Sequence, residues 1–432
     1  MKLKGIFQNR TLQNAGWIII GRVFNKVLAF VVGIITARYL GPGNYGLINY
    51  AAAYTTFFAS VCTLGIESVI IKNFCDHPEE EGTALGTTML LRCMSSLFSA
   101  VMIVGIVSIV DRGDPTAIWV VALSSLGMLF QSMDSFKQWF QSKLQSKYAA
   151  MATVVAYVLV SGYKILLLVT GKSVFWFAVA TSVDHVAVAL FLLAAYKKKG
   201  GPPLKWSAVK AKELLTASSS YIVAGLMISV YASTDRLMLK QMMDETAVGY
   251  YGLAVSLSTT WAFLIQAVID SVYPSVIQAY KKDERLFEKR NRQLYAVVIY
   301  VAGAMSLAIC LLAQPIVRIL YGVEYLPAVQ PLRIVVWYTT FSYLGVARNA
   351  WLVCRNKQKY TKVLYASAAG INVVLNFLLI PLWGAAGAAV ASLVTQMATT
   401  VLLPPLIPAL RPNVRLMLEA AILKDVLPEK KR

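Results

Sequence analysis

The stretch AGWIIIGRVFNKVLAFVVGIITA (residues 15–37) is an apolar run long enough to cross a bilayer. A transmembrane helix needs about 20 mostly apolar residues. Comparable blocks follow along the chain, separated by short polar connections. With the first, they give twelve predicted spans at about 15–37, 44–73, 84–110, 115–137, 148–170, 173–196, 214–240, 247–279, 288–313, 331–352, 360–380 and 385–408. The sequence therefore predicts an all-α, polytopic membrane protein.

The composition supports this class. Of the 432 residues, 58% are hydrophobic and 14% are charged, whereas soluble domains average about 45–50% apolar and about 25% charged residues. The net charge of +20 would also suit a nucleic-acid-binding protein, but lysine and arginine lie between the spans and form no basic stripe. The five cysteines are scattered without metal-site spacing. We predict no metal, no nucleic-acid partner and no catalytic residue.

The distribution of basic residues predicts the orientation. If the N-terminus is cytoplasmic, the inside connections hold 29 lysines and arginines and the outside connections hold five, while seven lie within spans. Positively charged connections stay on the cytoplasmic side during insertion. We therefore expect a multi-pass protein of the cytoplasmic membrane with both termini inside the cell.

An internal repeat predicts two halves. GNYGL at 43–47 recurs as GYYGL at 249–253, an offset of 206 residues that also superimposes several predicted spans. We expect two six-helix bundles of the same orientation, as in transporters built from parallel repeats. The predicted parts are an N-terminal lobe (1–200), a cytoplasmic linker (201–213), a C-terminal lobe (214–410) and a basic cytoplasmic tail (411–432).

Three motifs resemble a known family. They are TARYLGPGNYGLINYA at 36–51, STDRLMLKQMMDETAVGYYGLA at 233–254 and LYGVEYLPAVQPLRI at 320–334. In these motifs, and in their order and spacing, the chain resembles the Wzx-like polysaccharide flippases of the multidrug/oligosaccharidyl-lipid/polysaccharide exporter superfamily. The resemblance implies two six-helix bundles around a central cavity. It also implies a transporter that flips a polyprenyl-diphosphate-linked oligosaccharide by alternating access for surface polysaccharide biosynthesis. It also implies membrane lipids and polysaccharide assembly proteins as partners.

Basic residues inside spans are candidates for binding an anionic cargo, because a charge at the bilayer centre is costly unless it faces a cavity or a partner. Arg22 and Lys26 share one helix face, with Asn25 beside them, and would bind a diphosphate. Alternatively, they pair with an aspartate of a neighbouring helix. Arg38 is either a gate or an interfacial anchor. The predicted substrate-binding residues are Arg22, Asn25, Lys26, Arg38, Arg92 and Lys164.

Acidic residues inside spans are candidates for coupling transport to Na⁺ or H⁺, since a buried carboxylate can exchange a proton or bind a cation as its access changes. The acidic candidates are Glu67, Asp134, Asp184, Asp235 and Asp270, and His185 is included because it lies next to Asp184. Asp235 leads because its TDR sequence resembles the seventh-helix pattern of the family. The alternative is that these acids neutralise basic residues of the cavity. No other cofactor is predicted.

Two other functions compete with a flippase. A membrane polysaccharide polymerase or glycosyltransferase would need an acid/base or metal constellation on a sizeable loop, and the outside connections are short, so we predict no enzyme. A multidrug or organic-ion exporter of the same superfamily would need an acidic cavity for a cation. The basic residues of the first half favour an anionic cargo.

Overall fold

A computed structural model describes the backbone of residues 10–424 and the side chains of residues 24–424 except Ser68. This part of the chain consists of helices and connections, with no β-strand. The chain divides into two compact units, Met1–Ser233 and Thr234–Arg432. The division falls inside one helix, some 20 residues beyond the predicted linker at 201–213.

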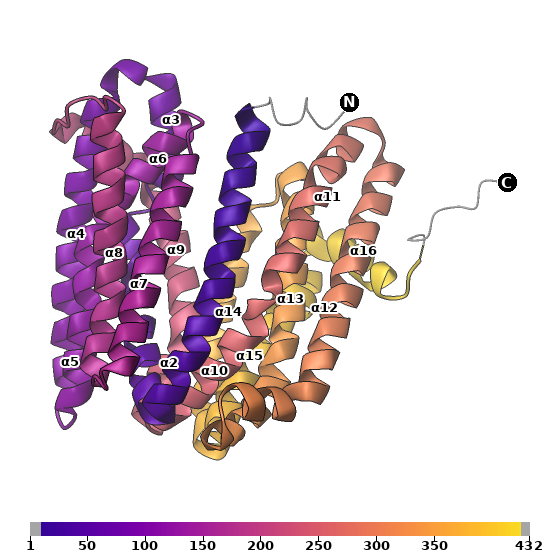
Figure 1. Ribbon diagram of the computed structural model, residues 1–432. Helices are drawn as coiled ribbons and strands as arrows, with labels where there is room; N and C mark the ends of the chain where they lie inside the picture. Colours follow the sequence, from indigo (N-terminus) through magenta and orange to yellow (C-terminus); the bar gives the residue numbers. More distant parts are fainter. Residues whose placement is uncertain (1–9, 425–432) are drawn as a thin grey trace, which may run out of the picture. The chain divides into compact units, whose positions relative to one another are not determined.

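The first unit holds the helices of the predicted N-terminal lobe. In chain order they are α2 (Arg10–Thr63), α3 (Glu67–Asp76), η1 (Pro78–Glu80), α4 (Glu81–Val110), α5 (Pro115–Ser125), η2 (Leu126–Asp134), α6 (Ser135–Ser142), α7 (Lys147–Val169), α8 (Val174–Lys198) and the first part of α9 (Ala208–Met242). Within this unit α4, α5, α7 and α8 lie side by side (Figure 1). At one end of this bundle, Phe136 and Trp139 of α6 pack against Tyr196 of α8, and Phe140 packs against Tyr148 of α7.

The second unit continues from α9. Its helices are α10 (Glu245–Thr260), α11 (Ala262–Lys282), α12 (Glu284–Leu320), η3 (Val323–Ala328), α13 (Val329–Cys354), α14 (Lys359–Trp383), α15 (Ala385–Met397), the π-helical turn η4 (Ala398–Leu402), the short η5 (Pro404–Leu406) and η6 (Pro408–Leu410), and α16 (Arg411–Ala421). Helices α12 and α13 pack closely, and α14 and α15 form a second close pair. A buried core around Phe287, Tyr295 and Trp351 joins α12 and α13.

Ten helical segments of the described chain are long and apolar enough to cross a membrane. One of them, Phe24–Thr63 of α2, contains parts of two predicted spans. The break between these spans lies at Gly41, which has non-helical backbone angles (φ 70°, ψ 170°) and is followed by Pro42. The predicted span 331–352 forms α13, which is not among the ten. The twelve predicted spans thus all lie on helices of the structure.

Several predicted boundaries are wrong in detail. The second span was expected to run to residue 73, but Leu64 and Gly65 both adopt positive φ values (52° and 58°) and turn the chain after Thr63. Glu67 therefore starts a new helix and does not lie within a span. The predicted spans 115–137 and 247–279 each lie within one membrane-spanning segment, Pro115–Ser142 and Glu245–Lys282. The first consists of α5, η2 and α6, and the second of α10 and α11.

The linker between the predicted lobes is held against the first unit. Lys205 donates its backbone N–H to the carbonyl of Gly82 at 3.2 Å, and Tyr196 donates its hydroxyl to the carbonyl of Pro202 at 2.5 Å. A Cβ at Gly82 would lie 2.3 Å from the carbonyl oxygen of Pro203. Glycine at this position lets the linker pass directly over the start of α4.

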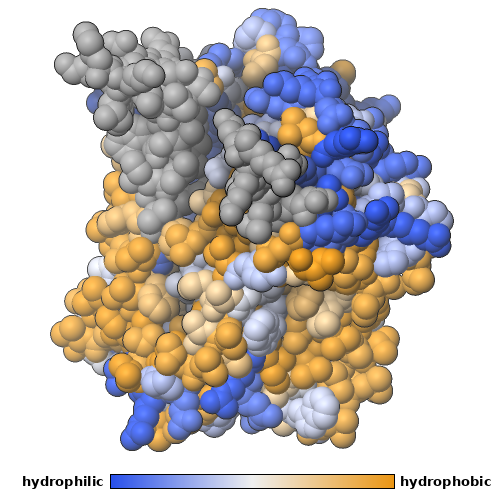
Figure 2. Space-filling view, turned by 90° about the vertical axis from the view of Figure 1, so that its right-hand side faces the viewer, coloured by the Kyte–Doolittle hydropathy of each residue, from blue (hydrophilic) through white to orange (hydrophobic). Residues whose placement is uncertain are grey.

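The outer surface is suited to lipid. Large apolar side chains such as Phe98, Leu311 and Phe377 are more than half exposed. On the face shown in Figure 2, hydrophobic residues dominate the middle and hydrophilic residues gather toward the ends. Apolar surface of this extent is stable in hydrocarbon and not in water. The chain is therefore a multi-pass membrane protein.

Candidate functional site

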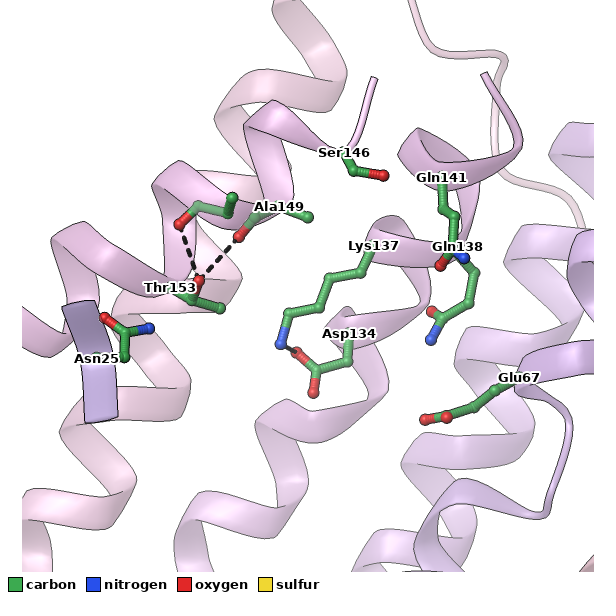
Figure 3. A pocket seen from close by; sticks show the side chains of 10 residues that line it. Asn25, Glu67, Asp134, Lys137, Gln138, Gln141, Ser146, Ala149 and Thr153 are labelled. Atoms are coloured by element: carbon green, nitrogen blue, oxygen red, sulfur yellow. Dashed lines mark hydrogen bonds and ion pairs between the residues drawn. The ribbon is translucent and has the colours of Figure 1, made fainter. Parts of the chain in front are cut away.

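A polar pocket of about 420 Å³ lies among the helices of the first unit (Figure 3). It is lined by one residue of α2 and one of α3, by the end of η2 with α6, and by the start of α7 with the residue before it. The polar lining residues are Asn25, Glu67, Asp134, Lys137, Gln138, Gln141, Ser146 and Thr153, and Ala149 and Ala150 complete the wall. Ligand pockets of proteins typically measure about 300–1,000 Å³. This pocket falls in that range.

The charged groups of the pocket are paired. Nζ of Lys137 lies 2.7 Å from Oδ1 of Asp134, one helical turn away. Oε1 of Glu67 lies 3.7 Å from Nη2 of Arg92, which lies behind the pocket lining on α4. Asn25, Glu67 and Asp134 are thus the predicted site residues that this pocket brings together.

Arg92 is built into the packing of the first unit. It is 2% exposed, and its Nη1 donates to the hydroxyl of Ser135 at 3.1 Å. Among the described residues, its Nε has no hydrogen-bond partner. Arg92 thus lies inside the packing of the first unit, between Glu67 and Ser135, and does not itself line the pocket.

A second pocket, of about 140 Å³, contains other predicted residues. Lys164 of α7 lines it, together with Asp184 and His185 of α8. Nδ1 of His185 lies 2.8 Å from the carbonyl of Thr181, which can only accept, so Nδ1 carries a proton. Nε2, 3.2 Å from the amide nitrogen of Gln131, can then accept its hydrogen bond. Both ring nitrogens of His185 therefore have a hydrogen-bond partner in this arrangement.

The remaining predicted cations of the first unit are less defined. Lys26 and Arg38 are exposed and line neither pocket. The backbone of Arg22 belongs to α2, but its side chain lies outside the described residues. The six predicted binding residues therefore do not form one cluster in the part of the chain that the structure describes.

The second unit contains a buried carboxylate cluster centred on Asp235 of α9, which is 7% exposed. Its Oδ1 accepts hydrogen bonds from Nδ2 of Asn372 at 3.0 Å and Nδ2 of Asn376 at 2.6 Å. Its Oδ2 accepts from the hydroxyl of Ser392 at 2.5 Å and from the hydroxyl of Tyr251. Four helices, α9, α10, α14 and α15, thus converge on one carboxylate.

Most of this cluster was missed from the sequence. Asn372 and Asn376 are one turn apart in an otherwise apolar span, which is a signal that could have been read. Ser392 lies in a run of small residues, a pattern that by itself indicates close helix packing. Tyr251 belongs to the repeated GYYGL motif. At the repeat offset of 206 residues, Tyr251 corresponds to Tyr45 in the first half, but Asp235 corresponds to Ala29. The carboxylate is therefore present in the second half of the repeat and not at the equivalent position of the first.

Oxygen atoms dominate the Asp235 cluster. Oδ1 of Asn376 is buried and has no hydrogen-bond partner among the described residues. Carboxylate, amide and hydroxyl oxygens are ligands for hard cations. No group of three His, Cys, Asp or Glu suited to a metal is found in the described chain. The other acid predicted in this unit, Asp270, is exposed and accepts from Gln266 at 2.8 Å.

The fold is similar to that of known membrane transport proteins. The lipid II flippase MurJ in an inward closed conformation matches with a TM-score of 0.73 and 14% identity over 94% of this chain and 91% of that chain. An inward-facing multidrug resistance MATE family transporter of the MOP superfamily matches with a TM-score of 0.66 and 16% identity over 92% and 96%. These matches confirm the predicted all-α fold of a polytopic membrane protein.

The sequence comparisons define the family more closely. The capsular polysaccharide biosynthesis protein CapF of Staphylococcus aureus is 20% identical over 402 residues, which covers 89% of this chain and 96% of CapF. The family described as polysaccharide biosynthesis protein matches residues 11–280, more than half of the chain. The chain belongs to this family, and the resemblance identified from its motifs is confirmed.

Proposed function

We propose that this protein flips a lipid-linked glycan, carried on polyprenyl diphosphate, across the cytoplasmic membrane by alternating access. The observation that carries the proposal is the polar pocket inside a bundle whose outer surface is apolar. A polar cavity at this position lets a hydrophilic head group leave water without entering hydrocarbon, while the lipid tail stays outside. Surface polysaccharide assembly proteins would use the product.

The diphosphate would be held by basic residues of α2. Asn25 lines the pocket, and Lys26 follows it in the chain and is exposed. Arg22 precedes both on the same helix and, as the forked donor, is the second proposed ligand. Lys164 and Arg38 are further candidates along the path of the cargo. In this proposal both termini lie in the cytoplasm.

Transport would be driven by a cation that binds at Asp235. A buried carboxylate surrounded by amide and hydroxyl groups can exchange its hydrogen-bond donors for Na⁺ or H⁺ when the lobe opens. Asn372 and Asn376 could rotate their amide groups to present oxygen to a metal ion, since the two ends of an amide are nearly equal in size. Asp184 with His185 is a second proposed proton-exchanging pair.

Export of an organic cation is the second candidate function. The carboxylates of Glu67 and Asp134 in the pocket favour it, because they could attract a positively charged compound. Both carboxylates already have cationic partners in Arg92 and Lys137, which reduces this attraction. A glycan cargo therefore agrees better with the pocket.

The test is a flipping assay with the purified full chain in liposomes. A fluorescent polyprenyl-diphosphate-linked disaccharide is added, and an external enzyme that trims the sugar measures how much of it is accessible outside. We expect the protein to move label between the leaflets faster than protein-free liposomes do. Equal rates, together with efflux of an organic cation such as ethidium, would exclude the flippase and support the exporter.

A further inference from the structure

The polar pocket is formed by two complementary helix faces. Along η2 and α6, polar residues follow the spacing of one face at i, i+3, i+4 and i+7: Asp134, Lys137, Gln138 and Gln141. Small residues follow the same spacing before and along α7: Ser146, Ala149, Ala150 and Thr153. Residues at this spacing share one side of a helix. The small side chains leave the space that the polar side chains surround.

The charges around this space cancel. Asp134 is balanced by Lys137 at 2.7 Å, and Glu67 is balanced by Arg92 at 3.7 Å. A diphosphate in this pocket would lie near two carboxylates. Its binding would gain little electrostatic free energy, because Lys137 and Arg92 already have anionic partners. An organic cation would likewise compete with both cations. The pocket is therefore polar without a net charge, which suits a neutral polar ligand.

Hydrogen-bond acceptors in the pocket lack donors. Gln138 is 9% exposed, and among the described residues no donor reaches its Oε1. The same holds for Oδ1 of Asn25. Thr153 donates its hydroxyl to the carbonyls of Ala149 and Ala150, at 3.2 and 2.8 Å, so its oxygen is left to accept (Figure 3). Unpaired buried acceptors are costly, and a ligand rich in O–H donors would satisfy them.

We propose that this pocket binds sugar hydroxyl groups of the cargo and that the diphosphate stays outside it. The inference rests on the proposed function and assigns one part of the cargo to one part of the protein. Gln138 and Asn25 would accept from the sugar, and the Lys137–Asp134 pair would supply a donor and an acceptor to adjacent hydroxyls. The pocket would thereby select the glycan that is flipped.

The experiment measures lipid binding to the purified full chain by native mass spectrometry. The probes are the lipid-linked glycans extracted from the cells that encode the protein, and the same extract after mild acid has removed the glycan. The test variant combines Asn25→Leu with Gln138→Leu. The control is Gln145→Leu, since Gln145 also has an unpartnered Oε1 but does not line the pocket.

We expect the wild type and Gln145→Leu to retain the intact lipid about tenfold or more over the sugar-free lipid, a ratio that corresponds to about 1.4 kcal/mol. The double variant should lose this preference but bind sugar-free lipid as the wild type does, which also shows that it folds. An unchanged preference in the double variant would overturn the inference. Equal binding of both lipids by the wild type would overturn it and leave the flippase proposal intact, whereas binding of neither lipid would overturn both.

Discussion

Asn376 donates a hydrogen bond to Oδ1 of Asp235 over 2.6 Å, although 141 residues separate them in the chain. The contact brings α14 against α9 at a fully buried point, since Asn376 is 0% exposed. A carboxylate held by donors from several helices can change its partners only when those helices move. This coupling between a charge and helix packing is what an ion-driven transporter requires.

We expect Asp235→Asn to abolish stimulation of transport by a Na⁺ or H⁺ gradient, with a loss of at least about tenfold, because the site no longer has the charge that attracts a cation. The liposome flipping assay, run with each gradient in turn, measures the effect and identifies the ion. Asp270→Asn is the control, since Asp270 is exposed and bonded only within its helix. Gradient-driven transport at the wild-type rate in Asp235→Asn would remove this residue from the coupling mechanism.

Filling the polar pocket should block transport. We expect Ala150→Phe to lower the flipping rate by about tenfold or more, because the ring would occupy space that the cargo needs. A loss of about 1.4 kcal/mol of cargo-binding free energy corresponds to a factor of ten. Met151→Phe is the matched control, as Met151 is the next residue on the same helix and is 42% exposed. If both variants transport normally, the pocket is not on the path of the cargo.

Arg92 should act on stability more than on cargo binding. Arg92→Met removes its contacts with Glu67 and Ser135 at nearly constant volume, and we expect the free energy of unfolding to fall by about 1–3 kcal/mol. Thermal unfolding in detergent gives the direction and size of the change. Binding of sugar-free polyprenyl diphosphate should stay within twofold. Loss of that binding at wild-type stability would instead make Arg92 a ligand of the phosphate.

Glu419 should make the docking of α16 depend on pH. Its carboxylate accepts from Arg292 of α12 at 2.6 Å, and from Arg415 and Lys424 at 3.0 and 3.3 Å. Burial raises the pKa of Glu419, but these hydrogen bonds outweigh burial and hold the pKa at about 2.

Because this pKa is lower in the folded state than in an unfolded chain, the carboxylate stabilises α16 fully above about pH 5 and loses this effect as the pH falls toward 2. We expect Glu419→Gln to weaken the docking at neutral pH and to remove its acid sensitivity in this range. Hydrogen exchange of the α16 amides between pH 6 and pH 3 measures both. Glu288→Gln is the control, because Glu288 lies 4.0 Å from the same arginine and is more exposed.

The sequence alone was sufficient for the class and the architecture. Runs of about 20 apolar residues have to cross the bilayer as helices, since backbone polar groups need partners within the segment in hydrocarbon. The repeated GNYGL and GYYGL motifs indicated two halves. The motifs around Arg38, Asp235 and Tyr325 indicated the family. These features are local or periodic, and so they can be read without coordinates.

The contents of the sites were decided by tertiary packing. Spacing within one helix showed that Arg22 and Lys26 share a face, but it could not show that Arg92 would be packed against Ser135 or that Asp235 would meet residues from three other helices. Gln138 was an ordinary polar residue in the sequence and became an unpaired acceptor only when α7 placed small side chains opposite it. Contacts between helices depend on how their faces are rotated against one another, and that rotation is set by the packing of the whole bundle.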